Sequence, residues 1–200
     1  MPRLVLGTRN KKKLGELLDL LGDLGLDLTD LSPYPHAPEV EETGTTFEEN
    51  ARLKATTLAP VLGEWVLGED SGLVVPSLGG APGIYSARWA GTQGNDAANN
   101  AKLLAELAGK SGDARAAYYV STAALCNPSG QVVAVVEAQC WGRIAETASG
   151  VGGFGYDPLF IVPEYHASFG ELSSLVKHAL SHRGRAIAKL RPILRTTFGV

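Results

Sequence analysis

Two predicted strands joined by a turn constrain the fold of this chain most strongly. Residues Tyr118–Cys126 and Gln131–Trp141 are rich in branched and aromatic side chains, and Asn-Pro-Ser-Gly at positions 127–130 is a turn sequence. The pattern predicts a β-hairpin. Elsewhere, predicted strands and helices mix without strict alternation, so we expect an α/β or α+β fold with a mixed sheet. A length of 200 residues suits one domain, or two closely packed lobes.

Apolar spacing, capping residues and prolines predict the remaining elements. Leucines recur at helical spacing between Lys11 and Leu21, and Thr46 with Glu49 fits a capping box. We therefore expect short strands at Leu4–Leu6 and Trp65–Leu67 and an extended segment from Asp157. We expect helices over Lys11–Leu21, from Thr46 to about Leu62, from an Asp96 cap to Leu107, and after a Ser181 cap. Loops are expected at Ser32–Pro38 and at 79–94.

The charges of the chain are segregated, although their total is close to zero. The sequence has 18 Lys and Arg residues against 21 Asp and Glu residues, a formal net charge of −3. The segment from Leu14 to Ala51 has acids but no Lys or Arg, and the segment after Leu172 has bases but no acid. The near-neutral total argues against a general nucleic-acid coat protein. A hydrophobic content of 44% argues against a disordered chain.

The sequence shows no sign of a membrane span or a signal peptide. Its longest aliphatic run, Val132–Val136, is far shorter than the roughly 18 to 20 residues that cross a bilayer, and Met1–Leu6 lacks the apolar core of a signal peptide. Cys126 and Cys140 have no CxxC spacing. They could face each other across the hairpin, but we expect buried free thiols and a cytoplasmic location, where thiols stay reduced.

A basic turn follows the first predicted strand. In Gly7–Lys13 this strand meets the N-terminus of a helix, where backbone N–H groups attract anions and three lysines add positive charge. The GxxxxGK[ST] spacing of a P-loop is absent. The segment favours an anion contact of another kind, although a solvated basic turn explains it equally well on its own.

Two acidic segments could supply oxygen ligands to a metal ion. Glu69-Asp70-Ser71-Gly72 directly follows a short apolar strand, and acids at strand ends commonly face a cleft. Glu41-Glu42 precedes a predicted helix. Because hard oxygen ligands suit Mg²⁺, the two segments together could form a carboxylate metal site. Taken alone, Glu41-Glu42 is better explained as surface charge, and residues 69–72 could also form an Asx turn.

Further candidates are a glycine-rich loop and a basic segment near the end of the chain. Residues 150–155 match GxGxxG, but Pro158 prevents a helix from starting there, so a dinucleotide site is rejected. A loop that packs an aromatic ring against a base is the better functional interpretation, and an ordinary turn is the alternative.

Lys177, His182 and Arg183 can donate to phosphate or to a base carbonyl, or can form a solvated helix face. His178 and His182 lack further ligands for zinc. The combined inventory suits Mg²⁺-dependent chemistry on a nucleoside polyphosphate.

These motifs together resemble the Ham1-like family of pyrophosphatases that act on non-standard purine nucleoside triphosphates such as inosine and xanthosine triphosphate. The matching stretches, in family order, are residues 8–13 with Glu16; 41–44 with 47–51 and 54–55; 69–73; 78–88; 154–158; and 181–183. The resemblance implies one domain over residues 1–200, with an elongated mixed sheet flanked by helices and two lobes around a central cleft. It also implies a homodimer that hydrolyses ITP, dITP and XTP to monophosphate and pyrophosphate, cleansing the nucleotide pool.

The resemblance also implies roles for individual residues. Glu41 and Asp70 would hold Mg²⁺, and Asp70 would act as the base on the attacking water. Ser71 would be a further substrate contact. The phosphates would contact Thr8, Arg9, Asn10, Lys11, Lys12 and Lys13, and the base would contact Phe154, Gly155, Tyr156, Asp157, Lys177, His182 and Arg183. Departures from the family pattern are Lys12 in place of Gly, Glu69 in place of Asp, and Val176 and His178 in place of the Glu and Asn that flank the lysine.

Two other function classes compete with this interpretation. A nucleotide sensor without catalysis would have little need for Glu41 and Asp70 beside a reacting phosphate. A binder of single-stranded nucleic acid could use the basic tail, but the net charge of −3 and the lack of aromatic residues among those bases disfavour it. We therefore expect a purine nucleoside triphosphate as the partner, and neither nucleic acid nor a membrane.

Overall fold

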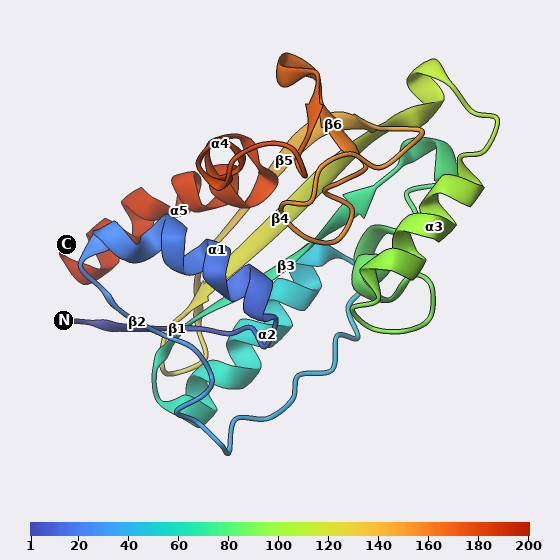
Figure 1. The fold of residues 1–200 in the computed structure, drawn as a ribbon. Coiled ribbons are helices and arrows are strands. Elements are labelled where there is room, and N and C mark those ends of the chain that lie inside the picture. Colours follow the sequence, from blue (N-terminus) through green and yellow to red (C-terminus); the bar gives the residue numbers. More distant parts are fainter. The chain divides into compact units, whose positions relative to one another are not determined.

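The computed structural model describes all 200 residues, with seven strands in one sheet (Figure 1). The strands are β1 (Arg3–Leu6), β2 (Asp27–Thr29), β3 (Trp65–Val74), β4 (Ala116–Cys126), β5 (Val132–Ile144), β6 (Phe160–Val162) and β7 (Ala167–Ser168). Their order in the sheet is β2-β1-β3-β4-β5-β6-β7. β1 pairs in parallel with β2 and β3, whereas β6 pairs antiparallel with β5 and β7. The predicted mixed sheet is confirmed.

Five α-helices accompany the sheet. They are α1 (Lys11–Leu21), α2 (Phe47–Leu62), α3 (Asp96–Glu106), α4 (Ser174–Leu180) and α5 (His182–Phe198). The predictions for α1 and α2 are confirmed, and each helix begins at a side-chain cap. The Asn10 side chain caps α1, and both hydrogen bonds of the Thr46–Glu49 capping box begin α2. No helix combines the length and the apolar composition that a membrane span requires.

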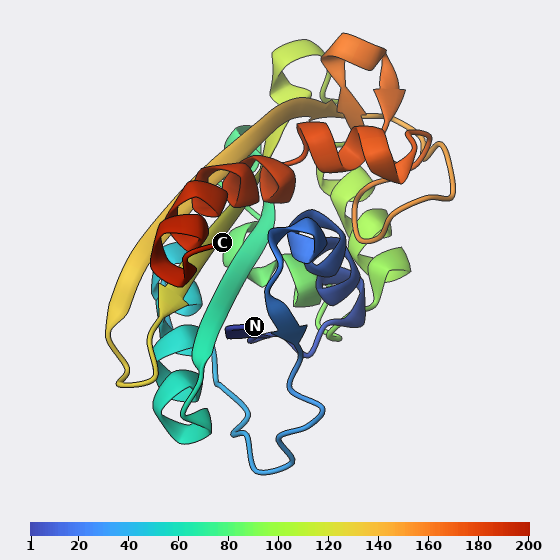
Figure 2. The ribbon, with the colours of Figure 1, turned by 90° about the vertical axis from the view of Figure 1, so that its left-hand side faces the viewer.

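The predicted hairpin is confirmed as β4 and β5, and its turn is built around Asn127. The Asn127 N–H donates to the Gln131 carbonyl at 3.0 Å, and its side-chain oxygen accepts from the backbone N–H of Ser129 and of Gln131. The tip lies beside α2 (Figure 2), where Gly130 adjoins the Pro60 ring. Cys126 and Cys140 are buried free thiols, as predicted.

The structure differs from the prediction at β3 and α3. β3 does not end at Leu67, where its pairing with β1 ends, but continues to Val74, with β4 as its neighbour on the other side. The acidic segment at 69–72 is therefore strand and not an Asx turn. Asn95 caps α3, and Asp96 is its first residue. The short elements β2, α4 and β7 have no counterpart in the prediction.

The chain divides into two compact units, and the division falls within β3, β4 and β5. The first unit comprises Met1–Asp70, Ser121–Ala138 and Arg183–Val200. It therefore contains β1, β2, α1 and α2 together with most of α5. The second unit comprises Ser71–Val120 and Gln139–His182, with α3, α4, β6 and β7.

In the first unit, alternation along β1 and β3 separates two apolar clusters. Leu4, Leu6 and Leu67 pack with residues of α1 and α5, two helices that lie side by side in Figures 1 and 2. Val5 and Val66 pack with residues of α2. Because successive side chains of a strand point to opposite faces of the sheet, α2 and the α1–α5 pair cover opposite faces of these strands.

In the second unit, the core is an aromatic cluster backed by leucines of α3 and the strands. The rings of Phe160 and Phe169 stack with their centroids 5.3 Å apart, and the Tyr119 ring lies 4.8 Å from that of Phe160. Leu103 and Leu107 are fully buried against the same cluster. Each unit thus buries apolar side chains of its own.

We expect Gly68→Ala to disrupt the contact between β3 and α2. A Cβ atom on Gly68 would lie 2.3 Å from the Ala51 carbonyl oxygen and 2.8 Å from the Ala55 nitrogen, so backbone would have to move. Urea unfolding should show a loss of about 3 kcal/mol or more. The control is Gly15→Ala in α1, where a Cβ meets nothing within 4 Å and should stabilise the helix by about 0.5–1 kcal/mol. Equal stability of Gly68→Ala and the wild type would contradict this packing.

Candidate active site

Alternation along β3 sends its two acidic residues to opposite faces of the sheet. Leu67 packs toward α1 and α5, and Gly68 lies against α2. Glu69 accordingly contacts residues of α1 and α5, and Asp70 contacts residues of α2. The two carboxylates are adjacent in the sequence but lie in different surroundings.

Glu69 is the centre of a buried charge cluster. Its Oε1 accepts from the Ser121 hydroxyl of β4 at 2.8 Å and from the Arg183 guanidinium of α5 at 3.0 Å, and its Oε2 pairs with Lys13 of α1 at 3.1 Å. Arg183 also pairs with Glu16 of α1. One carboxylate, only 1% exposed, thus fastens β3 to three other elements of the first unit.

The charge cluster also fixes the protonation state of Glu69. Burial alone would raise the pKa of this carboxyl, but the charges of Arg183, Lys13 and Lys54 and the Ser121 hydrogen bond outweigh burial. The pKa of Glu69 therefore lies well below its ordinary value. An ionised carboxylate with this many partners is suited to holding the fold together.

Asp70 lies against α2, with Lys54 and Asn50. Its Oδ1 pairs with the Lys54 ammonium at 3.0 Å, and its Oδ2 lies 3.4 Å from the Asn50 side-chain nitrogen. Lys54 also pairs with Glu42 at 2.8 Å. Because Asn50 and Lys54 are four residues apart, they lie on one face of the helix and reach the same carboxylate.

The surroundings of Asp70 shift its pKa in the opposite direction. Burial is the main cause and raises the pKa; Lys13 and Lys54 lower it, Glu42 raises it further, and the net pKa lies above the ordinary value. Neighbouring carboxyl groups whose pKa values are displaced in opposite directions commonly have different roles. Glu69 is the structural member of this pair, and Asp70 is the member suited to proton transfer.

Of the two acids before α2, Glu42 is the one that shares a partner with Asp70. Glu42 and Asp70 share the ammonium of Lys54, whereas Glu41 is exposed. The sequence does not distinguish these neighbours, because an irregular segment has no fixed alternation that assigns a side chain to one face. The carboxylates of Glu42 and Asp70 therefore lie on either side of one positive charge, the Lys54 ammonium.

The basic turn after β1 satisfies part of its own backbone. The Asn10 side-chain oxygen accepts from the N–H groups of Lys12 and Lys13 at 3.0 and 3.2 Å, and the Thr8 hydroxyl accepts from the Asn10 N–H at 3.2 Å. Two N–H groups at the start of α1 are therefore engaged by the cap. The side chains of Lys11 and Lys12 are exposed, and that of Lys13 turns inward to Glu69.

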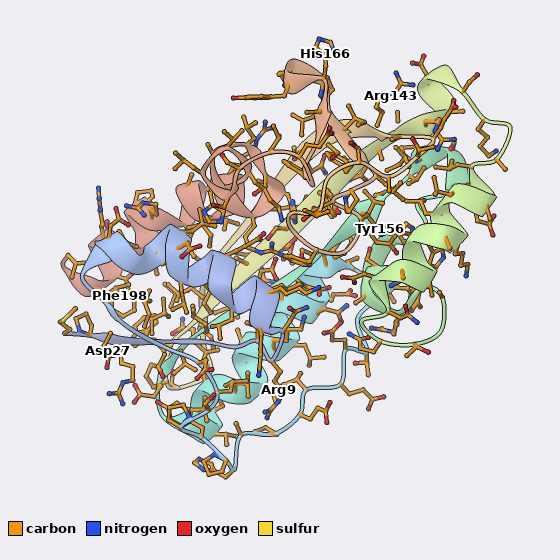
Figure 3. All side chains as sticks on the ribbon, in the orientation of Figure 1. Arg9, Asp27, Arg143, Tyr156, His166 and Phe198 are labelled. Atoms are coloured by element: carbon orange, nitrogen blue, oxygen red, sulfur yellow. The ribbon has the colours of Figure 1, made fainter.

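Two arginines of the first unit that were predicted to contact the substrate donate hydrogen bonds to other groups of the protein. The Arg9 guanidinium (Figure 3) donates to the Ala37 carbonyl at 2.9 Å. Arg183 is 1% exposed, and its Nε, NH1 and NH2 groups donate to Glu69 and Glu16. The structure therefore places Arg183 inside the charge cluster as the counter-ion of a buried carboxylate.

In the second unit, Asp157 brings several predicted base contacts together. Its Oδ2 accepts from the Lys177 ammonium at 2.6 Å and from the Phe154 N–H at 2.8 Å, and its Oδ1 accepts from the Tyr119 hydroxyl at 3.3 Å. The Lys177 nitrogen lies 4.7 Å from the centre of the Phe154 ring. The buried His182 ring stacks on Tyr119.

The loop that carries Phe154 is held in place by hydrogen bonds from α3. Asp96 accepts from the Gly155 N–H, and Asn100 donates to the Gly155 carbonyl, both at 3.0 Å. Gly153 has a φ of +70°, and a Cβ there would lie 2.0 Å from the Asp157 carboxylate. Only glycine therefore lets this carboxylate fold back onto the loop.

Two further residues of the second unit, Tyr156 and Ser71, were predicted to contact the substrate. Tyr156 is a core residue, and its hydroxyl donates to the Ser86 carbonyl at 2.9 Å. Ser71 is half-buried within β3.

No individual role was predicted for several residues around Asp70 and Asp157, although Glu42 and Glu69 belong to the two acidic segments that were candidates for a metal site. They are Glu16, Glu42, Asn50, Lys54 and Glu69 in the first unit, and Asp96, Asn100 and Tyr119 in the second. The sequence contains a signal for two pairs of these residues. Asn50 with Lys54, and Asp96 with Asn100, are polar pairs at helical i,i+4 spacing, which places each pair on one face of its helix. Tyr119 carried none, because it resembles Tyr118 in an apolar strand.

Comparisons with known proteins agree on one family. Residues 4–193 match the Ham1 family. A dITP/XTP pyrophosphatase of Rhodopirellula baltica is 53% identical over 96% of this chain and 92% of its own length. A HAM1 protein of Coxiella burnetii, 37% identical, superposes with a TM-score of 0.88 over 97% of this chain and 98% of its own. A nucleoside-triphosphatase / dITP/XTP pyrophosphatase of Mycobacterium abscessus is 44% identical, with a TM-score of 0.76 over 96% and 100% of the two chains.

We expect Arg183→Ala to destabilise the fold, because it leaves Glu69 buried without its main counter-charge. Removing one partner of a buried ion pair costs about 3–5 kcal/mol, measured as the free energy of unfolding in urea. Arg195→Ala is the matched control, since Arg195 is an exposed arginine of the same helix, and should change stability by less than about 0.5 kcal/mol. A loss below about 1 kcal/mol for Arg183→Ala would contradict its structural role.

Proposed function

Because the chain belongs to the Ham1 family, we propose that it hydrolyses the non-standard purine nucleoside triphosphates ITP, dITP and XTP to the nucleoside monophosphate and pyrophosphate. The observation that carries this proposal is the environment of Asp70, a buried carboxyl with a raised pKa held between Lys54 and Asn50. The names of the relatives above supply the substrate class.

Asp70 is the general base in this proposal. It accepts a proton from water while the water oxygen forms a bond to the α-phosphorus. The bond from that phosphorus to the bridging oxygen breaks, and pyrophosphate leaves. A positioned general base contributes typically about 10²–10⁴-fold to the rate. Lys54 supplies positive charge beside the reacting group, where a triphosphate brings several negative charges.

The residues around Asp70 fit a Mg²⁺ ion. Mg²⁺ is usually held by one or two carboxylates together with water and substrate phosphates. Asp70 is one such carboxylate. The candidates for the second are Glu41, which the family resemblance implies, and Glu42, which shares the Lys54 ammonium with Asp70. When bound, Mg²⁺ would offset phosphate charge that otherwise repels the nucleophile.

Base selection is assigned to Phe154, Lys177 and His182 of the second unit. The Phe154 ring offers a stacking surface for a purine. The Lys177 ammonium is a donor with no acceptor, so it can bind the 6-oxo group of hypoxanthine or xanthine but not the 6-amino group of adenine. A site that reads a polar group in this way rejects substrates that leave its donors unpaired.

We further propose that the enzyme acts in the cytoplasm and as a homodimer. Two buried free thiols support a reducing compartment, and the family resemblance supports the dimer. Light scattering of the purified chain would distinguish a dimer from a monomer.

A panel of ITP, dITP, XTP, GTP and ATP, assayed with Mg²⁺ and with the products resolved, tests the proposed function. We expect ITP, dITP and XTP to give monophosphate and pyrophosphate, with a kcat/KM at least about 10²-fold above that of ATP. Chelation of Mg²⁺ should abolish turnover, and re-addition should restore it. Release of diphosphate and orthophosphate, or equal kcat/KM for ATP and ITP, would contradict the proposal.

A further inference from the structure

Tyr119 contacts two of the groups assigned to base selection, although it carries no motif of its own. It lies on β4 and is 7% exposed within the core of the second unit. Its hydroxyl donates to Asp157 Oδ1 at 3.3 Å. Its ring stacks on the His182 imidazole, with 4.6 Å between centroids and 10° between planes.

The hydroxyl of Tyr119 is a third donor to Asp157, besides Lys177 and the Phe154 N–H. Oδ2 of this carboxylate accepts from Lys177 at 2.6 Å and from the Phe154 N–H at 2.8 Å, so the remaining oxygen faces Tyr119. Asp157 is 2% exposed. Because a buried carboxylate that loses a donor tends to reorient toward others, the hydroxyl also helps to fix the Lys177 ammonium that Asp157 holds.

The ring of Tyr119 fixes the plane of His182. A nearly parallel stack restricts tilting of the imidazole, and Tyr119 is itself held by Phe160, with 4.8 Å between ring centroids. The adjacent Tyr118 makes none of these contacts. It is only partly buried, and its ring packs on Trp141 at 4.5 Å.

On the basis of the proposed function, we propose that Tyr119 is a specificity-positioning residue, which orients Lys177 through Asp157 and His182 through ring stacking and so controls the preference for 6-oxo over 6-amino purines. Donors that discriminate between such groups must be held to within about 0.5 Å of their working positions. Tyr119 supports both donors, Lys177 through its hydroxyl and Asp157, and His182 through its ring.

The kinetic test compares Tyr119→Phe, which removes only the hydroxyl, with the control Tyr118→Phe on the same strand. We expect Tyr119→Phe to raise the KM for ITP by about tenfold, to change kcat by less than about twofold, and to narrow the ITP-to-ATP ratio of kcat/KM by about tenfold. Tyr118→Phe should leave all three values unchanged. An unchanged ITP-to-ATP ratio in Tyr119→Phe would overturn the proposal.

A proton NMR measurement on the free enzyme tests the stacking without relying on turnover. The His182 ring protons should show an upfield ring-current shift in the wild type and in Tyr119→Phe, and should lose it in Tyr119→Leu; His182→Asn assigns the signals. The same shift in all three proteins would refute the stacking. A wild type without ITP turnover would refute the proposed function and the selectivity role together, whereas an active wild type with an unaltered Tyr119→Phe would refute the role of Tyr119 alone.

Discussion

The ion pair between Glu69 and Arg183 is the interaction on which the first unit depends. Burying an isolated carboxylate or guanidinium costs several kcal/mol, which a close and well hydrogen-bonded partner can offset. Here each group is about 1% exposed, and Ser121, Lys13 and Glu16 complete the cluster. Because its members come from β3, β4, α1 and α5, the cluster fixes the relation of these elements within the unit. The conformation of β3 at the next residue, Asp70, follows from it.

Because side chains alternate along a strand, fixing Glu69 on one face of β3 places Asp70 on the opposite face. The odd-numbered Leu67 and Glu69 face α1 and α5, while Gly68 and Asp70 face α2. One neighbour is thus an ionised structural group with a lowered pKa, and the other is a buried carboxyl with a raised pKa beside Lys54. The second unit uses a similar device, since the buried Asp157 holds the Lys177 ammonium and the Phe154 loop. In both units a buried carboxylate positions a lysine.

Sequence patterns predicted the elements whose signals are local. The leucine spacing of α1, the capping box of α2 and the turn at Asn127 each depend on residues a few positions apart, and each is confirmed. The length of β3 depended on strands distant in the sequence, so its prediction ended too early. The pairing of Glu42 with Lys54, beside Asp70, depended on the path of an irregular segment. The burial of Arg183 depended on Glu69, 114 residues away, and no local pattern marks such a partner.

We propose that Glu69 stabilises the fold and that Asp70 acts in the reaction, and paired measurements on Glu69→Gln and Asp70→Asn separate these two roles. For each variant, urea unfolding and pyrophosphate release from ITP would be measured on the same preparation. We expect Glu69→Gln to lose about 3–5 kcal/mol of stability, because Arg183 loses its most deeply buried counter-charge and keeps only Glu16. We expect Asp70→Asn to fold with nearly wild-type stability, since a raised pKa means that the fold disfavours the charged form of Asp70, and to lose about 10²-fold or more in kcat. Near-normal turnover in Asp70→Asn, or a greater loss of stability in Asp70→Asn than in Glu69→Gln, would contradict this division of roles.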